Sequence, residues 1–293
     1  MMRSLWSAAS GMIAQQTNID NIANNLSNVN TTGYKKDTIE FKTLLYQTLQ
    51  SKSTNNTGEN KPIPAQVGLG TRTASITTVF TQGNLQATDN NSYMAIAGDG
   101  LFKAKNTDGE VCFTRDGSFN LMNTNEGVML CTSGGCPVLD QNNNSINIPK
   151  RTQINGVDVE TTGKIYVDKE ANIFFEYIDN DNETAVRVPL QSTLNGQAYD
   201  QKLGIVQFSN PSGLDQAGEN LYRQTVASGE PIEESANDGL LKSAVHQGYL
   251  EMSNVQVADE MVNMIVAQRA YEMNSKAIQA TDEMLQQANN LRR

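Results

Sequence analysis

The 293-residue chain contains a single histidine, His246, and a single tryptophan. A metal site with two histidine ligands is therefore excluded, as is any mechanism that requires a second imidazole. No run of apolar residues reaches the ~18 that a membrane-spanning helix requires. The N-terminal stretch includes Arg3 but no continuous apolar core like that of a cleavable signal peptide. We therefore expect a chain that is cytosolic or is exported without a cleavable signal.

Charged and apolar residues are both scarce. Charged residues make up 18% and apolar residues 38% of the chain, where about 25% and about 45–50% (glycine included) are usual. The formal net charge of −10 argues against a nucleic-acid-binding protein, which needs a basic face. Asn, Gln, Ser, Thr and Gly make up the difference. This composition predicts folded parts joined by polar, weakly ordered connections.

Cysteine occurs only at Cys112, Cys131 and Cys136, an odd number without a CxxC pair. Small buried or half-exposed thiols are the favoured interpretation. A Cys131–Cys136 disulfide is the alternative, because the turn Ser133-Gly134-Gly135 could bring these two residues together. A cysteine nucleophile would need His246 or another source of activation, and nothing in the sequence places them together.

Motifs for catalysis, metal binding or cofactor binding are incomplete. Asp179, Asp181 and Glu183 alternate as at the start of an EF-hand loop, but Thr184 and Leu190 stand where the glycine and the closing glutamate belong. We interpret the three acidic residues as a solvated hairpin tip. The sequence contains no phosphate-binding loop, GxSxG elbow or HExxH pair. We therefore predict no catalytic residue, no metal ligand and no cofactor.

The N-terminal segment repeats every seven residues between Leu5 and Val29. Spacings of three and four residues place both sets on one helical stripe, which is typical of a coiled-coil seam. Gly33 is the expected stop. One seam position holds Leu5, Met12, Ile19 and Leu26, and the other holds Ala8, Gln15, Ile22 and Val29.

The C-terminal segment mirrors this pattern. Ser253-Asn254-Val255-Gln256 fits a capping box, and the chain then runs to Leu291 without proline or glycine. A helix that is apolar on more than one side needs more than one neighbour. One stripe holds Val255, Ala258, Val262 and Ile265; a second holds Val266, Ala270, Met273, Ala277, Ala280, Met284 and Leu291; a further face holds Met261, Met264, Tyr271, Ile278 and Leu285.

Between these helices the hydrophobic period changes to two, and Asp108-Gly109 is a strong hairpin signal. The turn spacing predicts a largely antiparallel β domain. Strands are expected at Ser92–Gly98, Leu101–Lys105, Val111–Arg115, Ser118–Met122, Val128–Cys131, Ile146–Ile148, Ile165–Val167, Ile173–Tyr177, Ala185–Pro189 and Lys202–Phe208.

The expected fold class is α+β, with the N- and C-terminal helices pairing as a coiled coil and a central, mainly antiparallel β domain. Residues 1–35 with 248–293 form a discontinuous helical domain, and residues 73–232 form the β domain. Residues 36–72 and 233–247 are extended connections. The polar stretches Ser51–Ala65 and Ser228–Gly239 lie on the outgoing and returning paths.

Several segments carry a resemblance to a known family. The stretch from Ser10 to Lys35 has Gly11, Gln15, Asp20, Asn24, Asn25, Asn28, Gly33 and Tyr34 at matching places of an N-terminal signature. Further landmarks are Ile96–Phe102, Phe113–Phe119, Gly218–Tyr222, Gln247–Glu251, Ser253–Val255, Met261–Ile265 and Gln268–Glu272. These segments resemble the bacterial flagellar rod and hook family. The match is poorest over residues 142–201.

The resemblance implies a structural subunit, not an enzyme. It implies export through the flagellar type III apparatus without signal cleavage, and polymerisation in the periplasm into a helical tube that surrounds a channel. Paired terminal helices line that channel, and the β domain faces outward. The implied partners are other copies of the chain, proximal rod subunits and hook protein at the tube ends, and surrounding bushing rings.

The assembly residues implied on the N-terminal helix are Leu5, Met12, Ile19, Ile22, Leu26 and Val29. Those on the C-terminal helix are Val255, Val262, Ile265, Val266, Met273, Ile278, Met284 and Leu291.

Within the family, the polar stretch after Tyr46-Gln47-Thr48-Leu49 and the segment 268–276 are most similar to subunits of the distal part of the straight rod. A hook or proximal rod subunit is the alternative of the same kind. A secreted cell-wall-acting enzyme is the remote alternative, with Asp179 or Glu234 as the carboxylates to replace in a turnover assay. Glu233-Glu234 lie in a polar stretch that we expect to be flexible.

We predict that both terminal segments are loosely ordered in the monomer and become ordered on assembly. Pairing them closes the loop from residue 30 to residue 254, which costs entropy, and Ala8 and Gln15 weaken the seam. In the NMR spectrum of dilute monomer, amide signals from both ends should cluster near random-coil positions. Sharp, dispersed signals from both ends would contradict this prediction.

Overall fold

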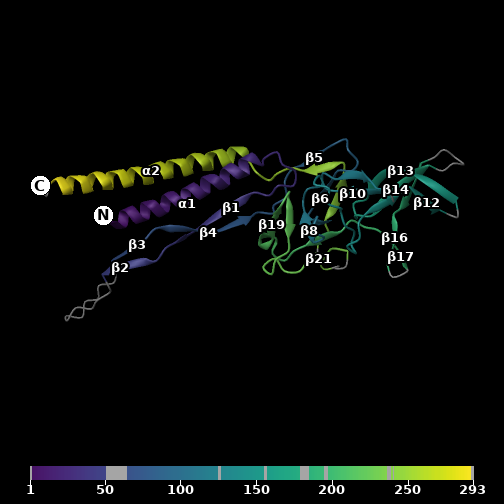
Figure 1. The fold of residues 1–293 in the computed structure, drawn as a ribbon, viewed down its shortest axis with the longest axis horizontal. Helices are drawn as coiled ribbons and strands as arrows, with labels where there is room; N and C mark the ends of the chain where they lie inside the picture. The colour runs from purple at the N-terminus through teal and green to yellow at the C-terminus, as the bar shows by residue number, and fades with distance from the viewer. Residues whose placement is uncertain are drawn as a thin grey trace. The chain divides into compact units, whose positions relative to one another are not determined.

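The computed structural model describes residues 2–50, 65–124, 127–154, 157–178, 185–194, 197–235, 239 and 241–291 (Figure 1). A long helix lies near each end of the chain, and the strands between them form mostly antiparallel sheets. The predicted α+β class is confirmed at this level. The chain forms two compact units: unit 1 comprises Met1–Ser27, Asp37–Thr78 and Val255–Arg293, and unit 2 comprises Asn28–Lys36 and Val79–Asn254.

The elements follow in the order α1 (Met2–Ser27), β1 (Asp37–Thr43), β2 (Tyr46–Gln50), β3 (Ala65–Gly68), β4 (Thr71–Thr78), β5 (Leu85–Ala87), β6 (Met94–Ala97), β7 (Leu101–Lys105), β8 (Val111–Thr114), β9 (Asn120–Asn123), β10 (Gly127–Cys131), β11 (Asn147–Pro149), β12 (Arg151–Ile154), β13 (Val157–Val167), β14 (Ile173–Ile178), β15 (Ala185–Pro189), β16 (Gln191–Leu194), β17 (Gln197–Asp200), β18 (Ile205–Gln207), η1 (Pro211–Gly213), β19 (Asp215–Gly218), β20 (Leu221–Arg223), β21 (Ile232–Glu233), β22 (Ala244–Gln247), β23 (Tyr249–Glu251) and α2 (Val257–Asn290).

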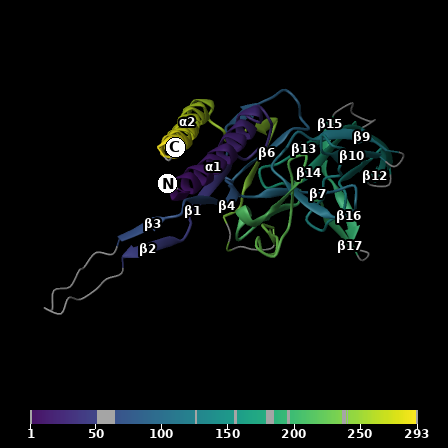
Figure 2. The ribbon, with the colours of Figure 1, turned by 60° about the vertical axis from the view of Figure 1, so that its left-hand side comes forward.

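Unit 1 contains both helices. Helices α1 and α2 contact each other and lie side by side in both ribbon views (Figures 1 and 2). Strand β1 pairs with β4 from Asp37↔Thr78 to Thr43↔Thr71, and β2 pairs with β3. These four strands were not predicted from the sequence, although the β-branched residues of β1 and β4 favour extended backbone. Most of the polar stretch Ser51–Ala65 lies outside the described residues.

Unit 2 is built around a six-stranded sheet in the order β19-β20-β8-β7-β18-β21. The predicted β7–β8 hairpin is confirmed, and Gly109 in its turn has a φ of +86°. Strands β7 and β15 have the predicted bounds. The main hydrophobic core combines residues from several sheets, and the rings of Phe102 and Phe119 pack edge to face with centroids 5.0 Å apart. The acidic trio Asp179, Asp181 and Glu183 lies outside the described residues.

Two local predictions were wrong. Helix α2 begins at Val257, and its N-cap residue is Gln256, which makes no side-chain cap hydrogen bond, so Ser253 is not the N-cap that a capping box requires. The stretch Ser228–Gly239 is not a purely flexible connection, because β21 within it pairs with β18 and the Glu234 side chain is buried; residues 236–238 lie outside the described residues. Both errors arose where contacts distant in sequence decide the backbone conformation.

The cysteines are free and buried. This confirms the interpretation of small structural thiols, and the alternative Cys131–Cys136 bridge is not formed. Cys112 and Cys136 pack with Ala104 and Leu221 in a small apolar cluster. Burial raises the pKa of the Cys112 and Cys131 thiols, so the reactive thiolate is disfavoured at neutral pH.

We predict that all three thiols are protected in the folded chain. Reaction with a thiol reagent such as DTNB requires local opening, so it should be roughly 100-fold slower or more in buffer than in urea at the same pH. Rapid labelling of any one cysteine in the folded chain would contradict this. The reaction in urea is the control and should count three thiols.

Candidate assembly surfaces

The covered side of α2 follows a heptad repeat. Its side chains alternate at spacings of four and three residues, and most are buried or half-buried. Gly11 of α1 lies against this side, because a Cβ at Gly11 would stand 2.8 Å from Nδ2 of Asn274. One position of the repeat holds Glu260, Ala267, Asn274 and Thr281, and the other holds Met264, Tyr271, Ile278 and Leu285. The side of α2 that α1 covers is therefore partly polar.

A second side of α2 is apolar and exposed. We call Val262, Ile265, Val266, Met273 and Met284 the uncovered face of α2; all five are exposed, and Met273 has an exposed fraction of 66%. At 100° per residue this face lies roughly half a turn from the heptad positions. Large exposed apolar patches of this kind mark protein–protein contacts.

The structure separates the predicted assembly residues of α2 into two groups. Val255 is buried and Ile278 is half-buried, whereas Leu291 is exposed together with the uncovered face. The sequence pattern placed apolar residues on more than one side of the helix, but it did not show which side α1 covers. That choice depends on Gly11, where the absence of a side chain permits close approach.

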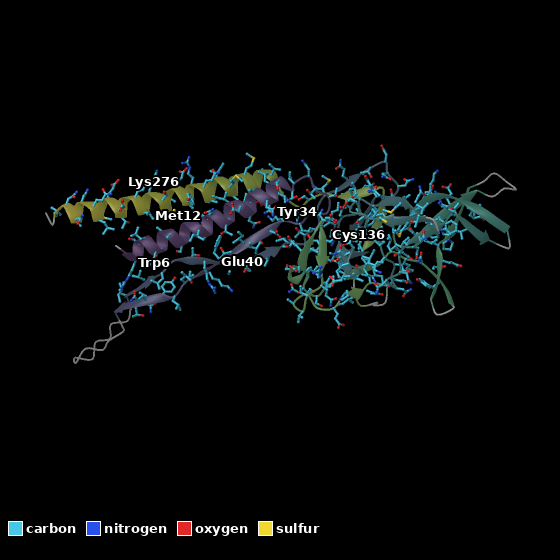
Figure 3. The ribbon with its side chains drawn as sticks, viewed as in Figure 1. Trp6, Met12, Tyr34, Glu40, Cys136 and Lys276 are labelled. Carbon is cyan, nitrogen blue, oxygen red and sulfur yellow. The ribbon has the colours of Figure 1, made fainter. Side chains whose placement is uncertain are left out.

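The predicted residues of the N-terminal helix lie mainly on the covered side. Ile22 is buried, and the other five are half-buried: Leu5, Met12, Ile19, Leu26 and Val29, the last of which lies in unit 2 beyond the end of α1. Trp6 and Ile13 were not predicted as assembly residues, but they are 69% and 68% exposed. They lie seven residues apart and therefore share one side of α1. Figure 3 labels Trp6.

Among the signature residues, Asn25 has a clear structural role in unit 1. Its Nδ2 donates to the Asp37 carbonyl at 2.8 Å, and its Oδ1 accepts from the Asp37 N–H at 3.0 Å. The end of α1 is thereby joined to the start of β1. Gln15 is half-buried and accepts a long hydrogen bond from Asn18, whereas Asp20 and Asn24 are exposed.

The remaining signature residues belong to unit 2. Gly33 has a φ of +68°, and a Cβ there would stand 2.5 Å from the Asp116 nitrogen, so no other residue fits without rearrangement. Its N–H donates to the Glu251 carbonyl. Asn28 accepts from the Thr31 hydroxyl, and Tyr34 is half-buried in the same turn (Figure 3).

A buried charge cluster surrounds Glu251 in unit 2. Its carboxylate accepts hydrogen bonds from Lys35 Nζ at 2.6 Å, from the Gly83 N–H at 2.9 Å and from Arg115 at 3.2 Å. Lys35 also donates to the Thr81 carbonyl. Burial lowers the pKa of the Lys35 ammonium, and the charge of Glu251 opposes that shift. Two buried cations thus share one carboxylate.

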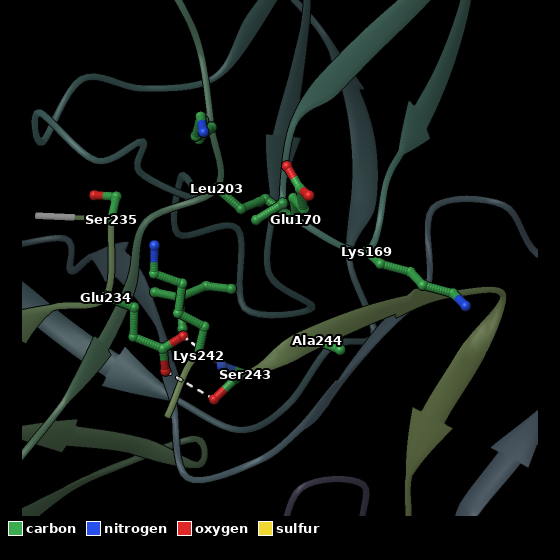
Figure 4. A pocket seen from close by; sticks show the side chains of 11 residues that line it. Lys169, Glu170, Leu203, Glu234, Ser235, Lys242, Ser243 and Ala244 are labelled. Atoms are coloured by element: carbon green, nitrogen blue, oxygen red, sulfur yellow. Dashed lines mark hydrogen bonds between the residues drawn. The ribbon is translucent and has the colours of Figure 1, made fainter. Parts of the chain in front are cut away.

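Glu234 lines a pocket of about 470 Å³ in unit 2 (Figure 4). Its carboxylate accepts from the Ser243 N–H and hydroxyl, both at 2.7 Å, and from Gln207 at 2.8 Å. These bonds give Glu234 a structural role and explain why this part of the chain is ordered. Asp179, the other carboxylate considered for catalysis, lies outside the described residues.

Within the described part of the chain, no three His, Cys, Asp or Glu side chains cluster in a way that could hold a metal ion. No helix among these residues is long and apolar enough to cross a membrane.

Comparisons with known proteins agree along the chain. The family model "Flagella basal body rod protein" matches residues 5–35, "Flagellar hook protein FlgE/F/G D1 domain" matches 95–167, and "Flagellar basal body rod FlgEFG protein C-terminal" matches 246–291. The chain is 44% identical to the flagellar basal-body rod protein FlgG of Borreliella burgdorferi, with 100% of both chains covered. It is 40% identical to FlgG of Buchnera aphidicola subsp. Acyrthosiphon pisum, with 99% and 100% covered, and 36% identical to FlgG of Bacillus subtilis, with 100% of both covered.

We predict that Glu251→Gln destabilises the chain by about 3–5 kcal/mol, because it removes the charge of the one carboxylate that pairs with both buried cations. Urea unfolding measures the change. Lys35→Met should cost less, because Arg115 and Glu251 remain a balanced pair. The exposed Glu219→Gln is the control and should stay within about 0.5 kcal/mol of the wild type. A larger loss for Lys35→Met than for Glu251→Gln would contradict this account.

Proposed function

The chain belongs to the family of flagellar basal-body rod proteins, and from this premise we propose that it polymerises into the rigid distal rod. The rod transmits motor torque to the hook and encloses the export channel. The observation that supports this proposal most directly is the uncovered face of α2, an apolar surface that α1 leaves exposed.

The two helices pair as a coiled coil in this proposal. The 4-3 spacing of the covered positions of α2 matches a heptad seam, and the seam is weak because Glu260, Asn274 and Thr281 occupy it. The seam between α1 and α2 is partly polar, whereas the uncovered face of α2 is apolar. This difference favours contacts between α2 and further copies of the chain. Residues 1–35 and 248–293 then act as one helical domain that is complete only in the polymer.

Copies of the chain meet through unlike surfaces. The uncovered face of α2 consists of a few side chains of one helix. In the proposed polymer it contacts a different surface of the next copy, such as the exposed Trp6 and Ile13 of α1. A contact between unlike surfaces does not close as a dimer does; it repeats and generates a helical tube. Packed interiors are stiff, which suits a shaft that carries torque.

The chain acts in the basal body, where the rod spans the periplasm, and is exported through the flagellar type III apparatus without signal cleavage. Its partners are copies of itself, proximal rod subunits and hook protein at the rod ends, surrounding bushing rings and the export apparatus. It has no catalytic role and needs no cofactor. Glu234 supports this, because its carboxylate accepts structural hydrogen bonds from Gln207 and Ser243 within unit 2.

Electron microscopy of basal bodies tests the proposal. Cells that lack this chain should form rods without their distal part, and the wild-type chain should restore it. Met273→Glu places a charge in the uncovered face and should abolish restoration. Gln279→Glu adds the same charge on an exposed polar side of α2 and is the matched control.

The purified variants separate assembly from folding. Met273 is exposed, so Met273→Glu should unfold in urea within about 0.5 kcal/mol of the wild type. Full-length rods built from Met273→Glu, or full-length rods in cells without the chain, would overturn the proposal.

A further inference from the structure

The chain passes between the two units four times, after Ser27, Lys36, Thr78 and Asn254. We call each of these crossing points a passage. In unit 2, the residues at three of the passages are hydrogen-bonded to one another. The Lys36 N–H donates to Asn254 Oδ1 at 2.8 Å, the Val79 N–H donates to the Lys36 carbonyl at 2.9 Å, and Asn254 Nδ2 donates to the Val79 carbonyl at 2.8 Å. One amide side chain therefore completes a ring that joins three passages.

In unit 1, the residues next to the passages are also hydrogen-bonded to one another. Asn25, just before the first passage, makes two hydrogen bonds to the backbone of Asp37. The Thr78 hydroxyl donates to Asp37 Oδ1 at 2.7 Å, and Asp37 also pairs with Thr78 in the ladder of β1 and β4. Asn25, Asp37 and Thr78 thus connect the unit 1 ends of the first three passages.

Local structure does not explain these bonds. Asn254 is not the N-cap of α2, which is Gln256. Its partners Lys36 and Val79 lie 218 and 175 residues away in sequence, so no turn motif requires them. Asn254 also donates to the Thr81 hydroxyl at 2.9 Å. Three residues earlier, Glu251 binds Lys35 and the Gly83 N–H, which fixes the segments on either side of the ring.

We propose that Asn25 and Asn254 are positioning residues that join the chain passages, so that load applied to either helix is shared among the passages. A single connecting strand held only by its own backbone would take the full load and open first. Hydrogen bonds in a network support one another, and each Asn offers both a donor and an acceptor to backbone groups. The consequence for torque rests on the proposed function, whereas the joining of the passages does not.

Hydrogen exchange on the purified full-length chain tests the joining directly. In Asn254→Ala the Lys36 amide loses its own acceptor, so faster exchange there is expected in any case. The Val79 amide is the discriminating readout, because its acceptor is the Lys36 carbonyl and not Asn254. We expect at least about tenfold faster exchange at Val79; an unchanged Val79 amide would overturn the proposal.

Two further variants keep the test decisive. Asn254→Asp retains the acceptor for Lys36 and removes the donor to Val79, so it should fold where Asn254→Ala does not and should still accelerate exchange at Val79. Asn210→Ala is the matched control, because Asn210 is exposed and its side chain donates to the Ala227 carbonyl within unit 2. It should leave the Val79 amide unchanged.

The effect on the sharing of load is tested in motile cells that carry each variant as their sole copy. Asn254→Asp should assemble rods in normal number but swim at least twofold more slowly than the Asn210→Ala control in viscous medium, with equal speed in buffer. Equal speed in viscous medium would overturn the role in load. If the wild-type chain itself failed to restore rods, the proposed function would fail, while the exchange result would still decide whether the passages are joined.

Discussion

A helix with apolar residues on two opposite sides needs two partners, and this chain supplies one of them. Helix α1 covers the side of α2 that contains Ala267, Asn274 and Ile278, and it approaches closely because Gly11 has no side chain. The opposite side, with Val262 and Met273, stays exposed. The incomplete burial of α2 links the fold of the single chain to its place in a polymer.

The β part of the chain has a large buried core of its own, in contrast to the helices. Its main core contains fully buried side chains such as Phe102, Phe119 and Ile146. Its least ordinary feature is electrostatic: the carboxylate of Glu251 serves two buried cations, one from the segment after α1 and one from the end of β8. Such clusters cost desolvation energy, and this one fixes the segments that flank both helices.

Much of the fold could be predicted because its signals are local. The β7–β8 hairpin follows from Asp108-Gly109, and the helices follow from the periodicity of their apolar residues. The strands of unit 1 were missed because their pairing joins residues 37–43 to residues 71–78 across a polar stretch. The capping box failed for a related reason: Ser253 is buried, and the side chain of the next residue, Asn254, is hydrogen-bonded to the distant backbone of Lys36 and Val79.

By itself, the sequence determined the α+β class, the two helices, the absence of a two-histidine metal site and the family resemblance. These depend on composition, on spacing and on short motifs. Only the tertiary structure decided which side of α2 is covered, that Glu234 is a buried structural carboxylate, and that Asn25 and Asn254 join the chain passages. Each of these depends on atoms brought within hydrogen-bonding or van der Waals distance from distant parts of the chain, and periodicity contains no information about such pairs.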